Sequence, residues 1–462
     1  MKKILCFYLI IQSSLIFAQQ KINPNLFGLR TSTAFLFFDI VDTGFVNKVD
    51  RLNAQVLSFP GGFGNFYHLN APGYGIKIDE VEKYHKGNKS KIARTFNSIT
   101  KKKNHQNNYI YDFIQLAKKT NSRVIYNVNI LTSKENEYLD VIDIFLDNNI
   151  NLIGVELGGE LSNSVYKHLI NPDTYIDLAK KHSEKIRSRF PNLKITVVAA
   201  PVNALRRHDA WNKKLSKENF YDGIIVHSYA KVTKGKDRFG QMISEVAEGT
   251  NKKDAFNIYK KRALNYFSAF YPTQISEYAR IFKNKPIWIT EWNLQMSKTT
   301  ANTFLQSLFI SSYLLELATN KKLKPIELTT FHNLAGRTLS ASLLMKSGDS
   351  QYVLNAYKTM RMMSDLFSNT ELEVLKKQNN NECFEYIFLK NKNEVFNFYI
   401  NWSKMPVDIS LNEKQERKIK EYYAKELFSN NKDDILFSST SLKSENFTLK
   451  PYSITLIESN IE

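Results

Sequence analysis

The chain contains very little cysteine. Its 462 residues include only two, Cys6 and Cys383. Cys6 lies in an N-terminal apolar run that we expect to be removed, so one cysteine would remain and no intramolecular disulfide could form. We therefore expect stability to come from a buried core, and a chain of this length can build one large domain or two moderate ones.

The chain also has no apolar run that is typical of a membrane-spanning helix. The run Ile4 to Ile11 follows Lys2 and Lys3, and a second short run ends at Ala18. A basic start, a short apolar centre and a small residue at the end are typical of a secretory signal peptide. We predict cleavage after Ala18, export to the periplasm or the extracellular space, and no integral membrane segment in the mature protein.

Acidic residues are outnumbered, 45 against 64 Lys and Arg, which gives a formal net charge of +19. This surplus could attract a polyanion such as nucleic acid or an acidic polysaccharide. The lysines are dispersed, however, as on solvated helix faces, and no nucleic-acid-binding motif is present. The His and acidic residues also do not follow the spacing of a metal-binding motif. We predict no nucleic-acid partner, no metal and no cofactor, and the sequence does not specify an oligomeric state.

From about residue 24 to 367 the sequence alternates between short apolar runs and helical periodicity. Helical spacing is clearest at Ile110, Phe113, Ile114 and Ala117, and it is weakest after the first run. Repeated strand–helix units require parallel strands covered by helices, and eight of them favour an α/β fold of the (β/α)8 TIM-barrel type over an open sheet. The predicted strands are 26–30, 55–59, 123–129, 152–157, 193–200, 222–227, 286–291 and 325–332.

After about residue 368 the pattern changes to strand-like runs separated by turns rich in Asn, Lys and Ser. These runs, 383–389, 395–402 and 452–457, predict a C-terminal antiparallel β-sandwich. The expected organisation is a signal peptide (1–18), a barrel (19–367) and a sandwich (368–462) to which the mature N-terminus could add a strand. The long unit between Tyr229 and Pro286 is expected to carry an inserted loop or an extra helix near the barrel mouth.

The reactive side chains of such a barrel lie at the C-terminal ends of its strands, and Glu160 and Glu291 follow strands four and seven. Hydrolysis of a glycosidic bond needs such a pair. One acid protonates the leaving oxygen, and the other attacks or stabilises the oxocarbenium-like centre. Glu156 could compete with Glu160, but strand alternation places it deeper, where it would bond internal polar groups. A hydroxyl such as that of Tyr229 could bond Glu291 and keep it ionised.

Further polar and aromatic residues lie at the strand ends or beside the two acids. Each of them could contact a sugar, and each could equally be a satisfied barrel residue or a packing aromatic. The candidates for substrate contact are Phe63, Asn129, His227, Tyr229, Trp292, Asn293 and His332.

Six stretches of the mature chain resemble one large clan of retaining glycoside hydrolases. Within it the closest likeness is to the heparanase and β-glucuronidase group, with β-xylosidases and α-L-arabinofuranosidases nearby. The resemblance implies that Glu160 is the acid/base and Glu291 the nucleophile. The stretches are Ile22-Asn-Pro-Asn-Leu-Phe-Gly, Phe59-Pro-Gly-Gly, Val155-Glu-Leu-Gly-Gly-Glu, Val226-His-Ser-Tyr, Trp288-Ile-Thr-Glu-Trp-Asn and Leu449-Lys-Pro-Tyr-Ser-Ile-Thr-Leu-Ile.

Two positions depart from the pattern of this clan. Gly159 stands where the clan usually has an Asn whose amide bonds the sugar 2-hydroxyl, and Ser58 stands where many members have Arg. Arg30, on the first strand, could replace that arginine and bind substrate.

We expect a secreted retaining glycosidase whose substrate is a polysaccharide or oligosaccharide, with acidic (uronic or sulfated) glycans among the candidates. The alternative is a non-catalytic carbohydrate-binding protein on a degenerate hydrolase scaffold. The distance between the two catalytic carboxyls separates these two functions, because a gap well beyond about 9.5 Å exceeds even the range of inverting enzymes.

Overall fold

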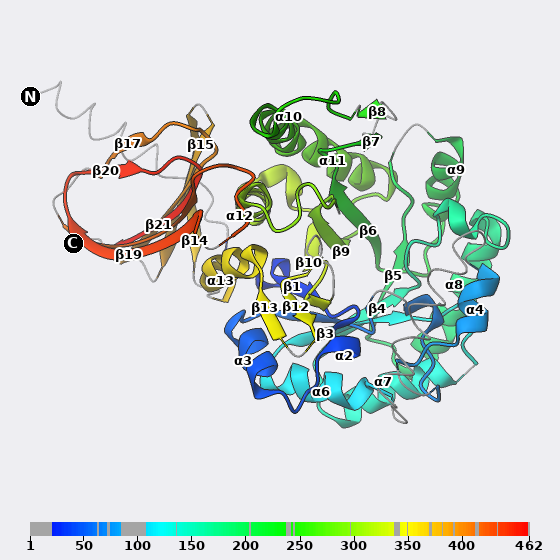
Figure 1. Cartoon of the computed structure of the whole chain (residues 1–462). Helices are drawn as coiled ribbons and strands as arrows, with labels where there is room; N and C mark the ends of the chain where they lie inside the picture. The colour runs from blue at the N-terminus through cyan, green and yellow to red at the C-terminus, as the bar shows by residue number, and fades with distance from the viewer. Residues whose placement is uncertain are drawn as a thin grey trace, which may run out of the picture.

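Figure 1 shows the computed structural model of the chain. It describes residues 21–460 except 62–63, 72–73, 85–107, 135, 203–204, 237–241, 244, 296, 337–341, 349, 369–371, 381, 391–392, 412–414 and 432. The signal peptide predicted at residues 1–18 therefore lies outside the described residues, and so does Phe63. None of the helices in the described residues combines the length and apolar character needed to cross a lipid bilayer.

Eight parallel strands close into a barrel in the order β1-β10-β9-β6-β5-β4-β3-β2. This confirms the predicted fold class, because each strand overlaps one of the eight predicted apolar runs. Two strands, β6 and β9, continue three residues past their predicted ends. The barrel strands are β1 (Gly28–Arg30), β2 (Val56–Phe59), β3 (Arg123–Val128), β4 (Leu152–Leu157), β5 (Lys194–Val198), β6 (Gly223–Ala230), β9 (Ile287–Leu294) and β10 (Ile326–Phe331).

Helices surround the barrel, and the sequences of α6 and α8 show why these two form where they do. In α6 the residues at helical spacing, Ile110, Phe113, Ile114 and Ala117, are all buried. A capping box at Asn171 begins α8. The helices are α2 (Ala34–Phe37), α3 (Thr43–Arg51), α4 (Ile78–Tyr84), α6 (Ile110–Lys119), α7 (Glu137–Asp147), α8 (Pro172–Arg189), α9 (Arg206–Leu215), α10 (Lys252–Asn265), α11 (Tyr271–Ile281), α12 (Phe304–Thr319) and α13 (Asn355–Ser368).

Short elements complete the barrel domain. The long unit before β9 contains the hairpin β7–β8 (Gly235–Lys236, Met242–Ile243), α10 and a π-helical turn, η4 (Tyr266–Phe270), as expected of an insertion. The sequence analysis did not predict a three-stranded sheet after β10, formed by β11 (Ala335–Gly336), β12 (Leu344–Ser347) and β13 (Ser350–Val353). The 3-10 turns are η1 (Pro24–Leu26), η2 (Gly64–Phe66), η3 (Ser164–Tyr166) and η5 (Lys321–Leu323).

The C-terminal part is antiparallel, as predicted. Its main sheet has the order β14-β15-β16-β21-β18-β19, and a separate pair, β17 and β20, packs over one face through Leu449 and Ile409. Lys21, at the start of the described residues, forms a single antiparallel bridge with Glu373. The strands are β14 (Glu373–Asn380), β15 (Cys383–Lys390), β16 (Glu394–Asn401), β17 (Val407–Ser410), β18 (Glu416–Ala424), β19 (Ile435–Lys443), β20 (Asn446–Leu449) and β21 (Ser453–Asn460).

Helix α12 lies between the barrel and the C-terminal sheet, and nearly all of its residues are buried. On its sheet side the indole of Trp402 donates to the Ser312 hydroxyl at 3.0 Å, and the Tyr386 hydroxyl donates to Glu316 at 3.0 Å. On its barrel side Tyr313 stacks on Trp292 with ring centroids 4.0 Å apart. The two domains therefore share one helix as a common wall.

We predict that Trp402→Ala lowers the free energy of unfolding by about 3–5 kcal/mol, because it leaves a cavity against α12 and removes the partner of Ser312. Denaturant unfolding followed by circular dichroism measures this change. Met405→Ala is the control, since Met405 is 59% exposed in the same segment. Equal stability of the two variants would contradict the role of Trp402 in joining the domains.

Candidate active site

Glu160 and Glu291 meet at the mouth of the barrel. One oxygen of Glu160, one oxygen of Glu291 and a ring nitrogen of His227 all lie within 4.8 Å of one another. Glu291 lies within β9, and Glu160 follows the end of β4. The two acids predicted from the sequence are therefore brought together, at a separation far below the limit of about 9.5 Å set above.

Glu291 is surrounded by groups that stabilise a negative charge. Its Oε1 lies 3.0 Å from Nε of Arg30, and its Oε2 accepts a 2.8 Å hydrogen bond from the Tyr229 hydroxyl. Nδ1 of His227 lies 3.4 Å away and Nδ1 of His332 3.9 Å. Burial alone would raise the pKa of Glu291, but these neighbours outweigh it and hold the pKa well below its usual range. Glu291 is ionised at neutral pH.

The pKa values of the groups around Glu291 are shifted as well. Burial and then the charge of Glu291 raise the pKa of Tyr229 far above its usual value, so its hydroxyl stays a donor. Burial by itself would lower the pKa of His227, but Glu291 and Glu160 outweigh it and the pKa is raised. Burial lowers the pKa of His332, which packs edge-on against Tyr229. The two histidines beside Glu291 are therefore shifted in opposite directions, with the pKa of His227 raised and that of His332 lowered.

Glu160 is held in an uncommon backbone conformation, with φ at +50°. Its carboxyl is hydrogen-bonded to Nδ1 of His227 at 3.0 Å, and its side chain is 48% exposed. Gly158, two residues earlier, has φ at +82°, and a Cβ there would lie 2.5 Å from Leu161. This glycine lets the chain turn out of β4 and deliver Glu160 to the mouth.

Asn65, which the sequence analysis did not identify, clamps the residue next to Glu160. Its Oδ1 accepts from the Gly159 N–H at 2.7 Å, and its Nδ2 donates to the Gly159 carbonyl at 2.7 Å. Its loop is anchored by the buried His68, whose two ring nitrogens lie 2.9 Å from Glu137 and 2.6 Å from Glu80. The signal available in the sequence was its place in the loop that follows the Pro-Gly-Gly turn.

Glu156 lies deeper, as its position on the strand predicted. It is fully buried, it accepts from Nδ2 of Asn127 at 3.1 Å, and it lies 3.7 Å from Nη1 of Arg30. Burial alone would lower the pKa of Arg30, but Glu291 and then Glu156 outweigh it and raise the pKa. Arg30 is thus a buried cation shared by one acid at the mouth and one below it.

The two departures from the clan pattern have structural counterparts. Ser58 pairs in register with Arg30 on the neighbouring strand, so the guanidinium reaches the mouth from the same height, one strand over. At Gly159 an added Cβ would meet only the Asn127 side chain, at 3.4 Å, which is an ordinary contact. A guanidinium from the first strand thus lies beside Glu291, while the place beside Gly159 stays open.

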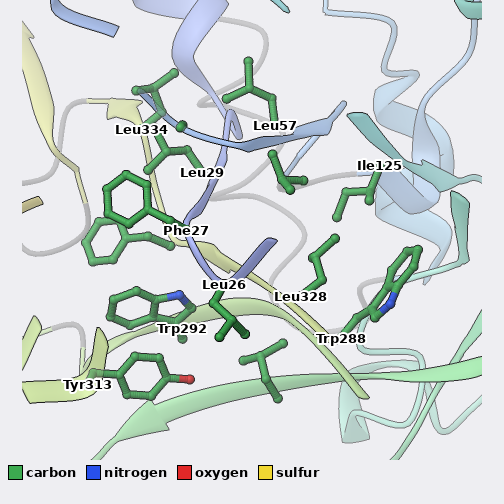
Figure 2. Close-up of a cluster of buried hydrophobic side chains, with 14 of the residues drawn as sticks. Leu26, Phe27, Leu29, Leu57, Ile125, Trp288, Trp292, Tyr313, Leu328 and Leu334 are labelled. Atoms are coloured by element: carbon green, nitrogen blue, oxygen red, sulfur yellow. The ribbon is translucent and has the colours of Figure 1, made fainter. Parts of the chain in front are cut away.

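Three of the predicted contact residues are not brought to the mouth. Trp292 packs on the opposite side of β9 from Glu291, as strand alternation requires, and it stacks on Tyr313 (Figure 2). Asn293 is fully buried and donates to the His332 carbonyl at 2.7 Å. Asn129 is fully buried and donates to the Tyr67 carbonyl at 3.2 Å. These three side chains are thus buried and bonded or stacked within the protein, whereas Arg30, His227, Tyr229 and His332 converge on the acids.

Glu160, His227 and Glu291 are also the one group of His, Cys, Asp or Glu in the described residues whose ligand atoms could converge on a metal ion. The Arg30 guanidinium opposes that use, because it places a permanent positive charge 3.0 Å from Glu291. The arrangement suits chemistry at a carbon centre that becomes positively charged, with one ionised carboxylate and a second carboxyl able to exchange a proton.

The chain is thus a closed (β/α)8 barrel with two carboxylates paired at its mouth. No protein-family model matches the sequence, and no curated protein matches it. Solved structures match in fold. An alpha-L-arabinofuranosidase from Thermotoga maritima, in complex with arabinose, has a TM-score of 0.65 at 13% identity, covering 96% of this chain and 98% of that one. An arabinofuranosidase from Xanthomonas axonopodis pv. citri has a TM-score of 0.67 at 11% identity, covering 95% and 97%.

A 4-O-alpha-L-rhamnosyl-beta-D-glucuronidase from Fusarium oxysporum has a TM-score of 0.56 at 12% identity, covering 95% of this chain and 97% of that one. These likenesses confirm the expected resemblance to the glycoside hydrolase clan at the level of the fold, over both the barrel and the C-terminal sheet.

We predict that Glu291→Gln lowers the pKa of His227. Burial depresses this pKa, and among the neighbouring groups the negative charge of Glu291 does the most to raise it. An NMR titration of the histidine ring protons measures the shift. His68 is the control, since its pKa is raised by Glu137 and Glu80 against the effect of burial. A His227 pKa that did not move, or that rose, would contradict the electrostatic coupling.

The same coupling sets a pH dependence of stability. The folded pKa of His227 lies above its unfolded value of about 6.5, so its contribution is complete below that value and is lost as the pH rises through the folded pKa. The folded pKa of Glu291 is depressed, so its contribution is present above the unfolded pKa and is lost as the pH falls through the folded one.

Proposed function

We propose that this protein is a retaining glycoside hydrolase in which Glu291 is the nucleophile and Glu160 the acid/base. The observation that carries the proposal is the approach of the two carboxylates, with oxygens within 4.8 Å of each other. Retaining enzymes hold the two groups about 5–5.5 Å apart, whereas inverting enzymes need about 6.5–9.5 Å to admit a water. This separation also supports catalysis over non-catalytic carbohydrate binding, and the fold shared with arabinofuranosidases and a glucuronidase adds support.

In the first step Glu291 attacks the anomeric carbon while Glu160 donates its proton to the leaving oxygen. The bond to the leaving group breaks, and a covalent glycosyl ester forms on Glu291. In the second step Glu160, now a carboxylate, takes a proton from water, and the resulting hydroxide displaces Glu291 from the sugar. The net result is hydrolysis with the original configuration at the anomeric carbon.

The neighbours of the two acids fit these roles. Arg30 and Tyr229 keep Glu291 ionised and turn its oxygens toward the mouth. Nδ1 of His227 lies 3.0 Å from Glu160, where its hydrogen bond stabilises the carboxylate that remains after proton donation. Asn65 fixes the backbone that carries Glu160.

The substrate is a saccharide, and the net charge of +19 supports an acidic one. The N-terminal segment has a basic start followed by an apolar run. We propose that it directs export and is cleaved after Ala18. The sugars named for the structural neighbours, arabinofuranosides and glucuronides, form the first assay panel together with xylosides.

We predict that Glu291→Gln abolishes hydrolysis of every glycoside in the panel, because no nucleophile remains. Glu160→Gln should lower kcat/KM for methyl glycosides by about 10²–10⁴-fold, the usual contribution of a general acid. It should change kcat/KM little for 2,4-dinitrophenyl glycosides, whose leaving group needs no proton. Assays of product release measure both values.

Glu184→Gln, an exposed change on α8, is the matched control and should keep wild-type activity. Mass spectrometry after reaction with a fluorinated mechanism-based glycoside should place the label on Glu291. Full activity of Glu291→Gln, or a label on another residue, would rule out the assignment.

We further predict that Asn65→Ala lowers kcat/KM for methyl glycosides by about 10²-fold, as for a misplacement of a catalytic group by roughly 1 Å. The reason is that Gly159 loses both side-chain bonds and Glu160 loses its fixed position. The 2,4-dinitrophenyl glycosides should be nearly unaffected, which separates mispositioning of the acid from general damage to the fold. Asn430→Ala, an exposed change, serves as the control; an equal loss on both substrate types would contradict the positioning role.

A further inference from the structure

The rim of the barrel opens between β5 and β6. Strand β5 ends at Val198, whose partner on β6 is Ile225, whereas β6 continues to Ala230 in register with β9. A cavity of about 660 Å³ occupies this notch. Figure 1 shows that α9 and α11 stand outside the ends of β5 and β6, and residues of both helices line the cavity.

The cavity borders the candidate active site beside Glu160 and not beside Glu291. Glu160, His227 and Tyr229 line its inner end, and Glu291 lies outside its lining. In the proposed reaction the acid protonates the leaving oxygen, so the leaving group lies on the side of Glu160. The notch is therefore where a leaving group would extend from the reacting carbon.

One wall of the notch is apolar. The chain after β5 presents Val198, Ala199, Pro201, Val202 and Leu205, and Phe270 of η4 and Tyr278 of α11 also line the cavity. Polar side chains complete the lining, among them Ser162, Asn163, His208, Lys231, Arg262 and Gln274. Within the described lining Glu160 is the one carboxylate. A continuous apolar wall accompanied by a few polar groups is typical of sites for small organic ligands.

Polar groups of the inner wall are already bonded within the protein. The Tyr278 hydroxyl donates to the Ala200 carbonyl and accepts from the Val202 N–H, both at 3.2 Å. The Tyr266 and Ser228 hydroxyls share a 2.6 Å hydrogen bond. A second sugar in this notch would therefore lose water from its hydroxyl groups and find these partners occupied.

We propose that the notch binds an apolar leaving group, so that the substrate is a glycoside of an apolar alcohol or phenol and not one in which a second sugar departs. This proposal rests on the proposed function and specifies its substrate class. A longer alkyl chain on the leaving group buries more methylene groups against Val202 and Leu205. These contacts are kept in the transition state, because the leaving group has not yet left the notch.

The test uses methyl, butyl and octyl glycosides of the sugar that is hydrolysed best in the panel, below the micelle concentration. The acidity of the leaving alcohol is nearly constant along this series, so differences in kcat/KM report binding of the chain. We expect kcat/KM to rise by up to about fourfold for each methylene that becomes buried, which corresponds to the transfer free energy of that group. The octyl glycoside should also be preferred over a disaccharide of the same sugar.

The matched variants are Leu205→Asn, at the cavity, and Leu169→Asn, outside its lining; the two residues are 48% and 40% exposed. Leu205→Asn should lower the octyl-to-methyl ratio of kcat/KM by about fourfold or more. Leu169→Asn should leave the ratio unchanged. Equal kcat/KM for methyl and octyl glycosides, or a preference for the disaccharide, overturns the apolar leaving-group site while the proposed activity stands; absence of hydrolysis of any glycoside overturns the activity itself.

Discussion

The buried guanidinium of Arg30 is the interaction on which the candidate site depends. A cation taken out of water must be paired, and this one lies 3.0 Å from Glu291 and 3.7 Å from Glu156. It makes it possible for Glu291 to stay ionised within 4.8 Å of a second carboxylate, since two uncompensated carboxylates that close would repel. The same ion pair connects the first and seventh strands of the barrel, β1 and β9. The charge state of the nucleophile therefore depends on a cation that comes from a strand two positions away in the barrel.

The second acid is positioned by a different principle, that of backbone geometry. Glu160 has a left-handed φ, and such a conformation persists only where its surroundings determine it. Those surroundings are Gly158, which permits the turn, and Asn65, which bonds both polar groups of Gly159. The loop of Asn65 is in turn held by His68 between two carboxylates, and those carboxylates outweigh burial to raise the pKa of His68. One acid is thus fixed by charge and the other by the loop after β2.

Local patterns were enough to predict the barrel, because all eight strands and most of the helices between them carry their own periodicity, and eight repeated strand–helix units are compatible with few folds. Strand-end logic was enough to find Glu160 and Glu291. The same logic, applied one residue further, placed Trp292 beside the substrate, although alternation turns it toward Tyr313 and α12 (Figure 2). Asn65 and Gly159 are 94 residues apart, and nothing in either segment indicates the contact. The sheet β11–β13 was missed because its strands are two to four residues long.

The notch lies where two neighbouring strands end at different heights. Strands β6 and β9 carry His227, Tyr229 and Glu291 as a paired wall, because their register runs up to Ala230 and Leu294. Strand β5 ends at Val198, opposite Ile225 of β6, and the chain that follows provides the aliphatic wall of the notch. The Tyr278 hydroxyl in this wall is already bonded to the Ala200 carbonyl, so the wall presents mainly carbon atoms to a ligand. Arg30, Tyr229 and the two histidines thus gather around Glu291, where the sugar reacts, and the aliphatic wall begins beyond Glu160, where the leaving group departs.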